Sequence, residues 1–290
     1  MKKLYILSII ALLFTFSINV HATNTTFYTN RESINMTEQQ YHNLLELGFS
    51  EDEIESMDID TFNANKNLEA ELVASETKYY KTTTITRDGI TTSRTEEVDE
   101  NEYNLSSNNT TPTLRNNGYI ETTYKKMTST ISQQASTYFR YKVTLEWKQM
   151  PSKRSYDIIV IGWESYNVTL LATPYIHQDY TYSGGSTGYG SSGTYQTWSG
   201  GASYIIDLPD STSITKLSSY MYIDVGKTYS GSTVTSLIAT GDYAHATSNI
   251  SLNNAKKHTV NYGGGIILDS SITSYYDTMN AAIATWTGTW

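Results

Sequence analysis

The feature that constrains this fold most is a ten-residue segment, 139–148, in which apolar and polar residues alternate without a break. Because successive side chains of a β-strand point to opposite faces, the pattern predicts a strand with one face in the core and the other in water. The apolar set is Phe139, Tyr141, Val143, Leu145 and Trp147, and the polar set is Arg140, Lys142, Thr144, Glu146 and Lys148. The next strand signal, Tyr156–Trp163, is apolar on both faces, as in a central strand buried between two layers.

Short strand signals continue along the chain with turn residues between them, at Asn167–Ala172, Ala202–Leu208, Tyr220–Val225, Thr233–Ala239, Thr247–Leu252 and Thr259–Leu268. Regular short strands without helical patterns between them predict a mainly β fold, with an antiparallel β-sandwich or barrel-like body. The Thr-rich segment Tyr79–Val98 predicts a hairpin with little to bury, which suits an edge or a protruding arm. We expect polar loops at Asn101–Asn117 and Tyr180–Gly201, and a final helix at Ser274–Ala284.

Charge is concentrated near the N-terminus. The segment Met36–Glu76 holds eleven acidic residues and one basic residue, Lys66, whereas Thr77–Trp290 holds 17 acidic and 16 basic residues. The formal net charge of −9 therefore comes from one acidic segment. Because the rest of the chain has no excess of basic residues, nucleic-acid binding is not predicted.

The acidic segment predicts a short helical hairpin. Thr37 and Ser50 each begin a capping box, Gly48 suits the left-handed position that ends a helix, and Asp58 can cap a third turn. A hairpin of about thirty residues cannot bury enough apolar surface to fold alone. We therefore expect it to dock on the β-rich body through an apolar stripe. This stripe consists of Leu44, Leu45, Ile54, Met57 and Phe62. The alternative is a removable pro-piece or a partner-binding arm.

The first 22 residues have the pattern of a signal peptide. Lys2 and Lys3 precede the largely apolar segment Leu4–Val20, and Ala22 fits a small-residue cleavage site. We therefore expect a secreted, extracellular protein with a signal peptide at 1–22, a linker at 23–35, the acidic helical segment at 36–74 and a β-rich domain at 75–290. The absence of cysteine excludes disulfides and cysteine-based sites, and in an exported chain it points to a Gram-positive bacterium.

Two segments carry a resemblance to other proteins. They are LGFSEDEI at 47–54 and WKQMPSKRSYD at 147–157. Together with the export signal, they resemble exported proteins of Gram-positive bacteria that have no characterised activity. The resemblance implies an export signal, a small helical segment and a β-rich remainder, and it supplies no catalytic residues.

Catalytic patterns are present but lack their usual context. Residues 184–188 read G-x-S-x-G and are followed by acidic candidates Asp207 and Asp210 and by His245 and His258, the residue order of a hydrolase triad. A nucleophile elbow, however, needs an apolar strand before it and a helix after it. The sequence therefore favours a non-catalytic protein, and an extracellular hydrolase remains an alternative.

Other polar candidates have structural interpretations. The segment His177–Asp179 follows Pro174 and is interpreted as a polar turn, and no histidine spacing indicates a metal site. Asp157 and Glu164 are the first candidates for a pair of glycosidase carboxylates, although Asp157 is more simply paired with Arg154. We predict no catalytic residues, no cofactor and no bound metal.

Aromatic residues interleaved with Gly and Ser provide the candidate binding surface, because flat rings with a polar edge suit sugar rings and protein surfaces. They are Tyr175, Tyr180, Tyr182, Tyr189, Tyr195, Trp198 and Tyr204. The predicted function is a non-catalytic extracellular or cell-surface binding or interaction protein, with a cell-wall glycan or another protein as candidate partner. The alternative is a membrane-active, pore-forming or bacteriocin-like protein that rearranges Tyr79–Val98 and Lys227–Leu252 into transmembrane strands; only this alternative has a membrane partner.

Overall fold

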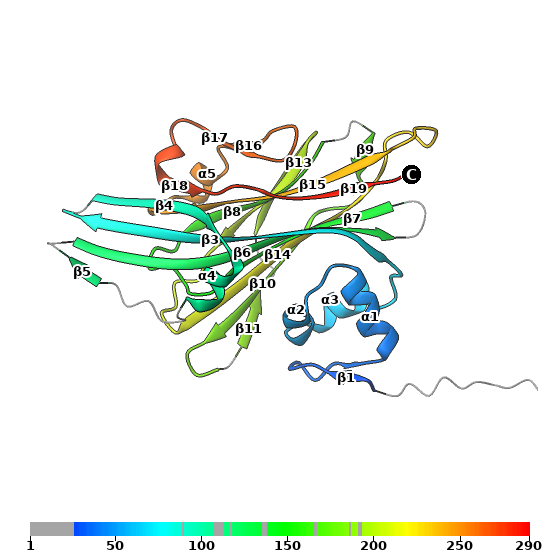
Figure 1. The fold of residues 1–290 in the computed structure, drawn as a ribbon, viewed down its shortest axis with the longest axis horizontal. Helices are drawn as coiled ribbons and strands as arrows, with labels where there is room; N and C mark the ends of the chain where they lie inside the picture. Colours follow the sequence, from blue (N-terminus) through cyan, green and yellow to red (C-terminus); the bar gives the residue numbers. More distant parts are fainter. Residues whose placement is uncertain are drawn as a thin grey trace, which may run out of the picture.

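The structure is a computed structural model that describes residues 26–88, 90–106, 113–115, 118–134, 138–164, 167–185, 187–190 and 193–290. The predicted signal peptide lies outside the described residues. Two antiparallel β-sheets pack face to face, and short N-terminal helices lie on the outer face of the larger sheet (Figure 1). This confirms a mainly β sandwich. Within the described ranges, no helix combines the length and the apolar character needed to cross a membrane.

The larger sheet has the strand order β11-β10-β14-β7-β6-β3-β4, with β5 paired to β6 and β9 paired to β14. Its strands are β3 (Glu71–Arg87), β4 (Ile90–Val98), β5 (Thr113–Arg115), β6 (Gly118–Gln134), β7 (Tyr138–Trp147), β9 (Val168–Leu170), β10 (Tyr175–Tyr182), β11 (Thr187–Gly190) and β14 (Ile214–Lys227). The predicted loop at Tyr180–Gly201 is therefore wrong, because most of its described residues belong to strands. The reason is that the segment is rich in Tyr and Thr, which favour strands, and its strands pair with β14 and β13 (Gly201–Asp207).

The smaller sheet has the order β12-β13-β8-β15-β18, with β19 paired to β15. Its strands are β8 (Tyr156–Trp163), β12 (Thr194–Trp198), β13 (Gly201–Asp207), β15 (Ser236–Ala246), β18 (Tyr276–Thr278) and β19 (Ala282–Thr287). As its two apolar faces predict, β8 lies between β13 and β15 and is buried. The short helix α5 (Leu252–Ala255) and the hairpin β16 (His258–Val260) and β17 (Ile266–Leu268) cover the outer face of this sheet.

The main core lies between the two sheets. The five apolar residues of β7 point into it and are fully buried, as their alternation predicts. Trp147 packs at the centre, where its indole N–H donates to the hydroxyl of Tyr243 over 3.1 Å. The inward face of β7 is therefore confirmed.

The outward face of β7 was predicted to be in water, and this is wrong. Arg140 and Lys142 are only 2% exposed, because the acidic segment covers them. That segment contains α1 (Glu38–Glu46), α2 (Glu51–Glu55) and α3 (Ile59–Asn65), and it follows a short hairpin of β1 (Tyr28–Thr29) and β2 (Asn35–Met36) that begins in the predicted linker. Its apolar stripe packs on Tyr220 and Tyr222 of β14 and forms a second apolar cluster. A strand pattern cannot reveal a cover that comes from elsewhere in the chain.

The local signals in the acidic segment are present as predicted. Both capping boxes form, from Thr37 to Gln40 and from Ser50 to Glu53. Gly48 has a φ of +84°, and Asp58 accepts from backbone N–H groups at the start of α3. The capping residues therefore fix where these helices begin, and the apolar stripe fixes which side faces the sheet.

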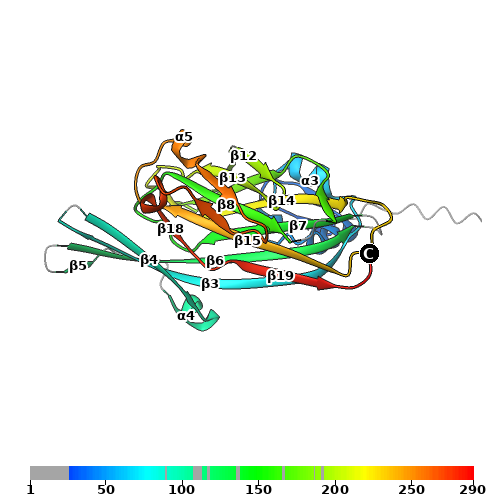
Figure 2. The same cartoon turned by 90° about the horizontal axis from the view of Figure 1, so that it is seen from above.

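Strands β3, β4, β5 and β6 extend beyond the sandwich as an arm, best seen in Figure 2. The hairpin predicted at Tyr79–Val98 is present and its outer part forms the arm, but Tyr80 and Thr82 at its base are buried against the sandwich. Within the predicted polar loop that follows, Glu100–Leu105 forms helix α4, which corrects the loop assignment. The cause is local, because the side chain of Asp99 accepts from the backbone N–H of Glu102 and caps the helix.

The C-terminal region corrects two further predictions. Ser274–Ala284 is not a helix: a 3₁₀ turn, Thr273–Tyr275, leads into β18 and β19. Pairing with β15 selects the strand, since Ala282 and Ala284 are buried and Ile283 is exposed. Thr247–Leu252 is not a strand either, because β15 ends at Ala246 and Ser251 caps α5.

Backbone hydrogen bonds close the end of the smaller sheet. Val234 and Trp290 exchange two of them, over 3.0 and 2.9 Å, and the Trp290 ring lies 4.8 Å from that of Phe139. Residues at the end of the described chain thus complete the core beside β7.

Candidate binding cleft

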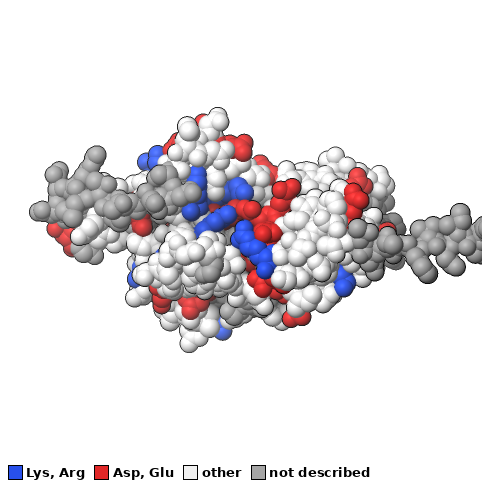
Figure 3. All heavy atoms as spheres, turned by 90° about the horizontal axis from the view of Figure 1, so that it is seen from below, with Lys and Arg blue, Asp and Glu red and all other residues white. Residues whose placement is uncertain are grey.

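A cleft of about 250 Å³ opens between the acidic segment and the β10–β11 hairpin, on the outer face of the larger sheet. Figure 3 shows this face, where Lys and Arg side chains form a band beside Asp and Glu side chains. The cleft is lined by residues of α2, β7, β10, β14 and the β1–β2 turn. It therefore brings together parts of the chain that are distant in sequence.

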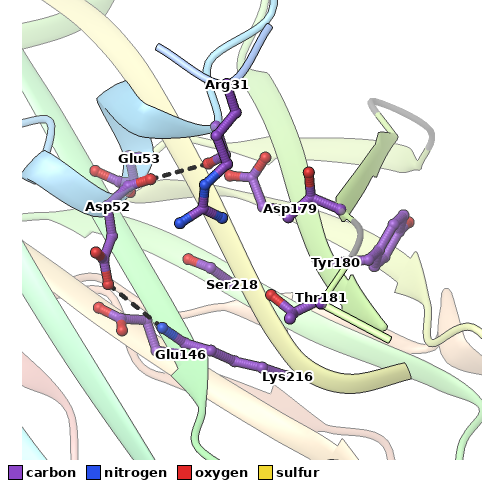
Figure 4. Close-up of a pocket in the computed structure, with 12 residues that line it drawn as sticks. Arg31, Asp52, Glu53, Glu146, Asp179, Tyr180, Thr181, Lys216 and Ser218 are labelled. Carbon is purple, nitrogen blue, oxygen red and sulfur yellow. Dashed lines mark hydrogen bonds and ion pairs between the residues drawn. The ribbon is translucent and has the colours of Figure 1, made fainter. Parts of the chain in front are cut away.

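Strand register builds the floor of the cleft. Asp179 of β10 is paired with Ser218 of β14, and Ser218 is paired with Glu146 of β7. Directly paired residues on neighbouring strands present their side chains on the same face, so these three lie side by side (Figure 4). The row continues to Lys126 of β6, whose ammonium lies 2.7 Å from Glu146.

Two cations stand at the mouth. The ammonium of Lys216 lies 3.3 Å from Asp52, which is in the first turn of α2. Arg31 uses its Nε to donate to Glu55 over 3.0 Å, and Figure 4 shows the outer end of its guanidinium directed into the cleft. The mouth therefore carries an arginine whose terminal amino groups face the open space.

A buried ion pair fixes α2 above the floor. The Lys142 ammonium lies 2.7 and 2.8 Å from the two Glu53 carboxylate oxygens and donates to Thr144 over 2.6 Å. Burial lowers the pKa of Lys142, and the adjacent carboxylate of Glu53 opposes this shift. Glu53 also accepts from the backbone N–H of Ser50 in the capping box, so one carboxylate both starts the helix and docks it.

The position of the Asp179 side chain is fixed by the buried imidazole of His177. Its Nε2 lies 3.0 Å from Asp179, its Nδ1 lies 3.4 Å from Asp58 of the acidic segment, and its ring stacks between Tyr220 and Tyr189. Burial raises the pKa of Asp179, whereas His177 lowers it. The predicted polar turn is therefore wrong: these residues belong to β10, whose pairing with β14 overrides the turn signal of Pro174.

Four of the seven candidate aromatic residues are engaged in contacts within the protein. Tyr175 stacks on a β14 tyrosine at 4.8 Å, and Tyr204 is buried with its hydroxyl donating to a backbone carbonyl. Tyr180 donates to Gln178, and Trp198 packs against the ring of His258 at 5.3 Å. These residues thus help to hold the two sheets and their connections.

The other three candidates do not form a single surface. Tyr182 lies along the β10–β11 hairpin beside Gly188, and Tyr195 is 47% exposed on β12 of the smaller sheet. Tyr189 is 52% exposed and is the cross-strand partner of Asp179. Of the predicted aromatic set, Tyr180 is the member that lines the cleft, and Tyr189 is an exposed ring next to Asp179, outside the lining residues.

The two histidines of the candidate triad have other partners. Ser186 lies outside the described residues. The Nδ1–H of His258 donates to the backbone carbonyl of Ala255 over 2.7 Å, and its Nε2 is hydrogen-bonded to the hydroxyl of Ser203 over 2.8 Å. His245 lies 3.0 Å from Asp157 and is buried. Both imidazoles are held inside the protein by structural hydrogen bonds.

The suspected glycosidase pair is separated by the length of a strand. Asp157 and Glu164 lie at the two ends of β8, about 23 Å apart at ~3.3 Å per residue, whereas paired catalytic carboxylates lie within about 10 Å. The predicted pairing of Asp157 with Arg154 is also wrong. Asp157 accepts from Tyr243 and His245, and Arg154 donates to backbone carbonyls of the 209–214 segment, since β8 directs Asp157 into the core.

Arg31, Lys216 and Ser218 are not recognisable as site residues in the sequence, and Glu146 stands out there only as a carboxylate on the polar face of β7. The available signal was the strictly alternating polar face of β7 together with a strongly acidic segment elsewhere in the chain. Opposite charges on two such elements suggest that they meet, but they do not show which residues stay open after docking.

No family model matches the sequence, and no curated protein matches it. Three solved structures are similar over much of the chain. The collagen binding domain of Erysipelothrix rhusiopathiae surface protein RspB is 7% identical, over 61% of this chain and 72% of that chain, with a TM-score of 0.25. BcpA, the major pilin subunit of Bacillus cereus, is 5% identical, over 72% of this chain and 64% of that chain, with a TM-score of 0.26.

The full-length major pilin SpaD from Corynebacterium diphtheriae is 11% identical, over 73% of this chain and 59% of that chain, with a TM-score of 0.26. This chain therefore spans less than two thirds of either pilin. TM-scores this low carry no argument about the fold or the function of this chain.

Proposed function

We propose that this protein is an exported, non-catalytic binding protein of the bacterial cell surface, and that the cleft above β7, β10 and β14 is its binding site. The observation that carries the proposal is the floor of the cleft, where Asp179, Ser218 and Glu146 lie side by side beneath an open mouth. The export part rests on the basic and apolar residues at the start of the sequence.

The way the cleft is held supports binding. The Glu53–Lys142 ion pair and the apolar cluster around Tyr220 fix the acidic segment on one side of the floor, and the β10–β11 hairpin rises on the other. A site whose two walls are already fixed loses little conformational freedom when a ligand enters. Polar side chains that converge in such a concave site are typical of ligand recognition.

A retention experiment on isolated Gram-positive cell walls tests the proposal. Two variants change the cleft: Lys216→Glu reverses a charge at its mouth, and Ser218→Val removes a hydroxyl from its floor. The matched control is Arg94→Glu, the same change of charge at a residue exposed on the arm. We expect both cleft variants to be retained at least tenfold more weakly than the control, with unchanged melting temperatures.

Equal retention of the cleft variants and the control would contradict the proposal. The same preparations are added to vesicles that contain a trapped dye. Release of the dye by the parent protein would favour the membrane-active alternative, and an intact vesicle together with wall retention supports the binding function.

A further inference from the structure

The cleft combines features that suit one class of ligand, and this inference rests on the proposed function. The acidic groups of the cleft already have partners: Asp52 with Lys216, Glu53 with Lys142, Glu146 with Lys126 and Asp179 with His177. A cationic ligand would therefore have to displace a side chain at each of these positions. The charges at the floor favour a ligand that is not a simple cation.

Arg31 offers the group that is least engaged. Its Nε is bound to Glu55, its side chain is 51% exposed, and its outer end points into the cleft (Figure 4). Two adjacent N–H groups of a guanidinium match the two oxygens of a carboxylate. Lys216 stands nearby in an exposed pair with Asp52, and such pairs are weak enough to exchange partners. The mouth is thus suited to a carboxylate on the ligand.

The floor of the cleft is suited to hydroxyl groups on the ligand. The Ser218 hydroxyl and the Asp179 Oδ2 have no hydrogen-bond partner of normal geometry among the described residues, although Ser56 approaches the Asp179 carboxylate. Thr181 and Thr187 also line this part of the cleft. Buried polar atoms without partners are costly, and a ligand hydroxyl can both donate and accept. A small side-chain movement would expose these atoms to it.

Tyr189 provides an apolar surface next to Asp179, at the edge of the cleft and outside its lining residues. It is the cross-strand partner of Asp179, about half of it is exposed, and its ring is held parallel to that of His177, with the centroids 5.6 Å apart. A fixed, flat ring of this kind suits the C–H face of a sugar, whose hydroxyls then point sideways to acids and hydroxyls. With a volume of about 250 Å³, the cleft is slightly smaller than most ligand pockets, which start at about 300 Å³, and suits a single ring.

We infer that the cleft binds an acidic sugar, a polyhydroxylated ring that carries a carboxylate. The carboxylate lies on Arg31 and Lys216, the hydroxyls reach Asp179 and Ser218, and the ring stacks on Tyr189. The site should therefore bind a uronic acid more tightly than the neutral sugar of the same stereochemistry.

Calorimetric titration of the protein with glucuronate and galacturonate, and with glucose and galactose, tests this inference. We expect at least one uronate to bind at least tenfold more tightly than its neutral counterpart. Arg31→Lys keeps the charge but loses the paired N–H groups, and it should weaken uronate binding about tenfold, the equivalent of ~1.4 kcal/mol. Arg94→Lys is the matched control and should bind like the parent protein.

The remaining outcomes test the binding function of the cleft and the acidic-sugar ligand separately. Equal binding of acidic and neutral sugars would overturn the role of the carboxylate. If none of the four sugars binds, while Lys216→Glu and Ser218→Val still reduce retention on cell walls, the sugar assignment is wrong and the binding function stands. If Arg31→Lys lowers the melting temperature, Lys216→Gln replaces it in the titration, with Lys256→Gln as its control.

Discussion

The two ends of the larger sheet use the same two long strands, β3 and β6, but they are stabilised differently. At one end both faces are covered, since Met127 and Ile131 point into the sandwich and Thr130 and Ser132 lie beneath the acidic segment. At the other end, the arm, Ile85 is 38% and Ile90 is 70% exposed. The comparison shows that the same strands need not be buried along their whole length.

Hydroxyl pairs replace apolar packing in the arm. Thr84 contacts Ser93 at 2.8 Å and Thr86 contacts Thr91 at 3.0 Å, whereas the Thr82–Thr95 pair lies at the buried base of the arm, where Thr95 also donates to Asp277. Cross-strand pairs of this kind contribute about 0.2–1 kcal/mol each, much less than a buried aromatic side chain. Most of the stability therefore resides in the covered end, and the arm should open first.

The largest expected effect comes from the core. Trp147→Ala removes a fully buried indole and its hydrogen bond to Tyr243, and should lower the free energy of unfolding by about 3–5 kcal/mol. The matched change in the arm, Thr84→Ala, should cost less than about 1 kcal/mol. Denaturant titration of both variants checks this, and similar losses would show that the arm carries as much stability as the core.

The next effect concerns ion pairs. Lys142→Met leaves the Glu53 carboxylate buried without its cation and should cost about 3 kcal/mol. Lys78→Met breaks the more exposed pair with Glu97, between β3 and β4, and should cost less than about 1 kcal/mol.

A second substitution sharpens this test. Glu53→Gln in the Lys142→Met background removes the unpaired charge, and glutamine still serves the capping box. Thermal unfolding should show that the double variant recovers part of the lost stability. A double variant less stable than Lys142→Met alone would contradict the burial argument.

A further comparison concerns the dependence of stability on pH. Lys125 of β6 points into the sandwich, its ammonium is 4.6 Å from the centre of the Trp147 ring, and it has no hydrogen-bond partner among the described residues. Burial lowers its pKa to about 8, from 10.5 in the unfolded chain. Between about pH 8 and 10.5 the unfolded chain binds more protons, so the contribution of Lys125 makes the free energy of unfolding rise with pH.

Lys125→Met should abolish this rise, whereas Lys126→Met, on the opposite face of the same strand, should retain it. Melting curves recorded from pH 7 to 10.5 provide the comparison. The same rise in the Lys125→Met variant would show that another group causes it.

Local sequence patterns were sufficient to predict the structure where local contacts determine it. The alternation of β7 predicted its inward face, and the capping residues Thr37, Ser50 and Asp58 predicted three helix starts. Partners far away in the sequence decide the rest. Lys142 is buried because Glu53, 89 residues earlier, lies above it.

The C-terminal error has a similar origin. The spacing of Tyr275, Met279 and Ile283 fits a helix as well as a strand, and pairing with β15 selects the strand. The candidate site shows the same limit, since register across three strands places Asp179, Ser218 and Glu146 together. Tyr189, which lies next to Asp179, was predicted as a binding residue only because it is aromatic.

The closure of the sandwich by its last strand has a consequence for the timing of folding. β19 pairs with β15, Trp290 packs on Phe139, and the hydroxyl of Tyr80 bonds to the carbonyl of Asn280, 200 residues later. Contacts between such distant residues form slowly, and here they need residues that are synthesised late. A chain that leaves the ribosome N-terminus first cannot complete this core until the strand near residue 290 has emerged. If the chain is exported as proposed, this core stays incomplete, and is therefore easier to unfold for export, until β19 and Trp290 have been synthesised.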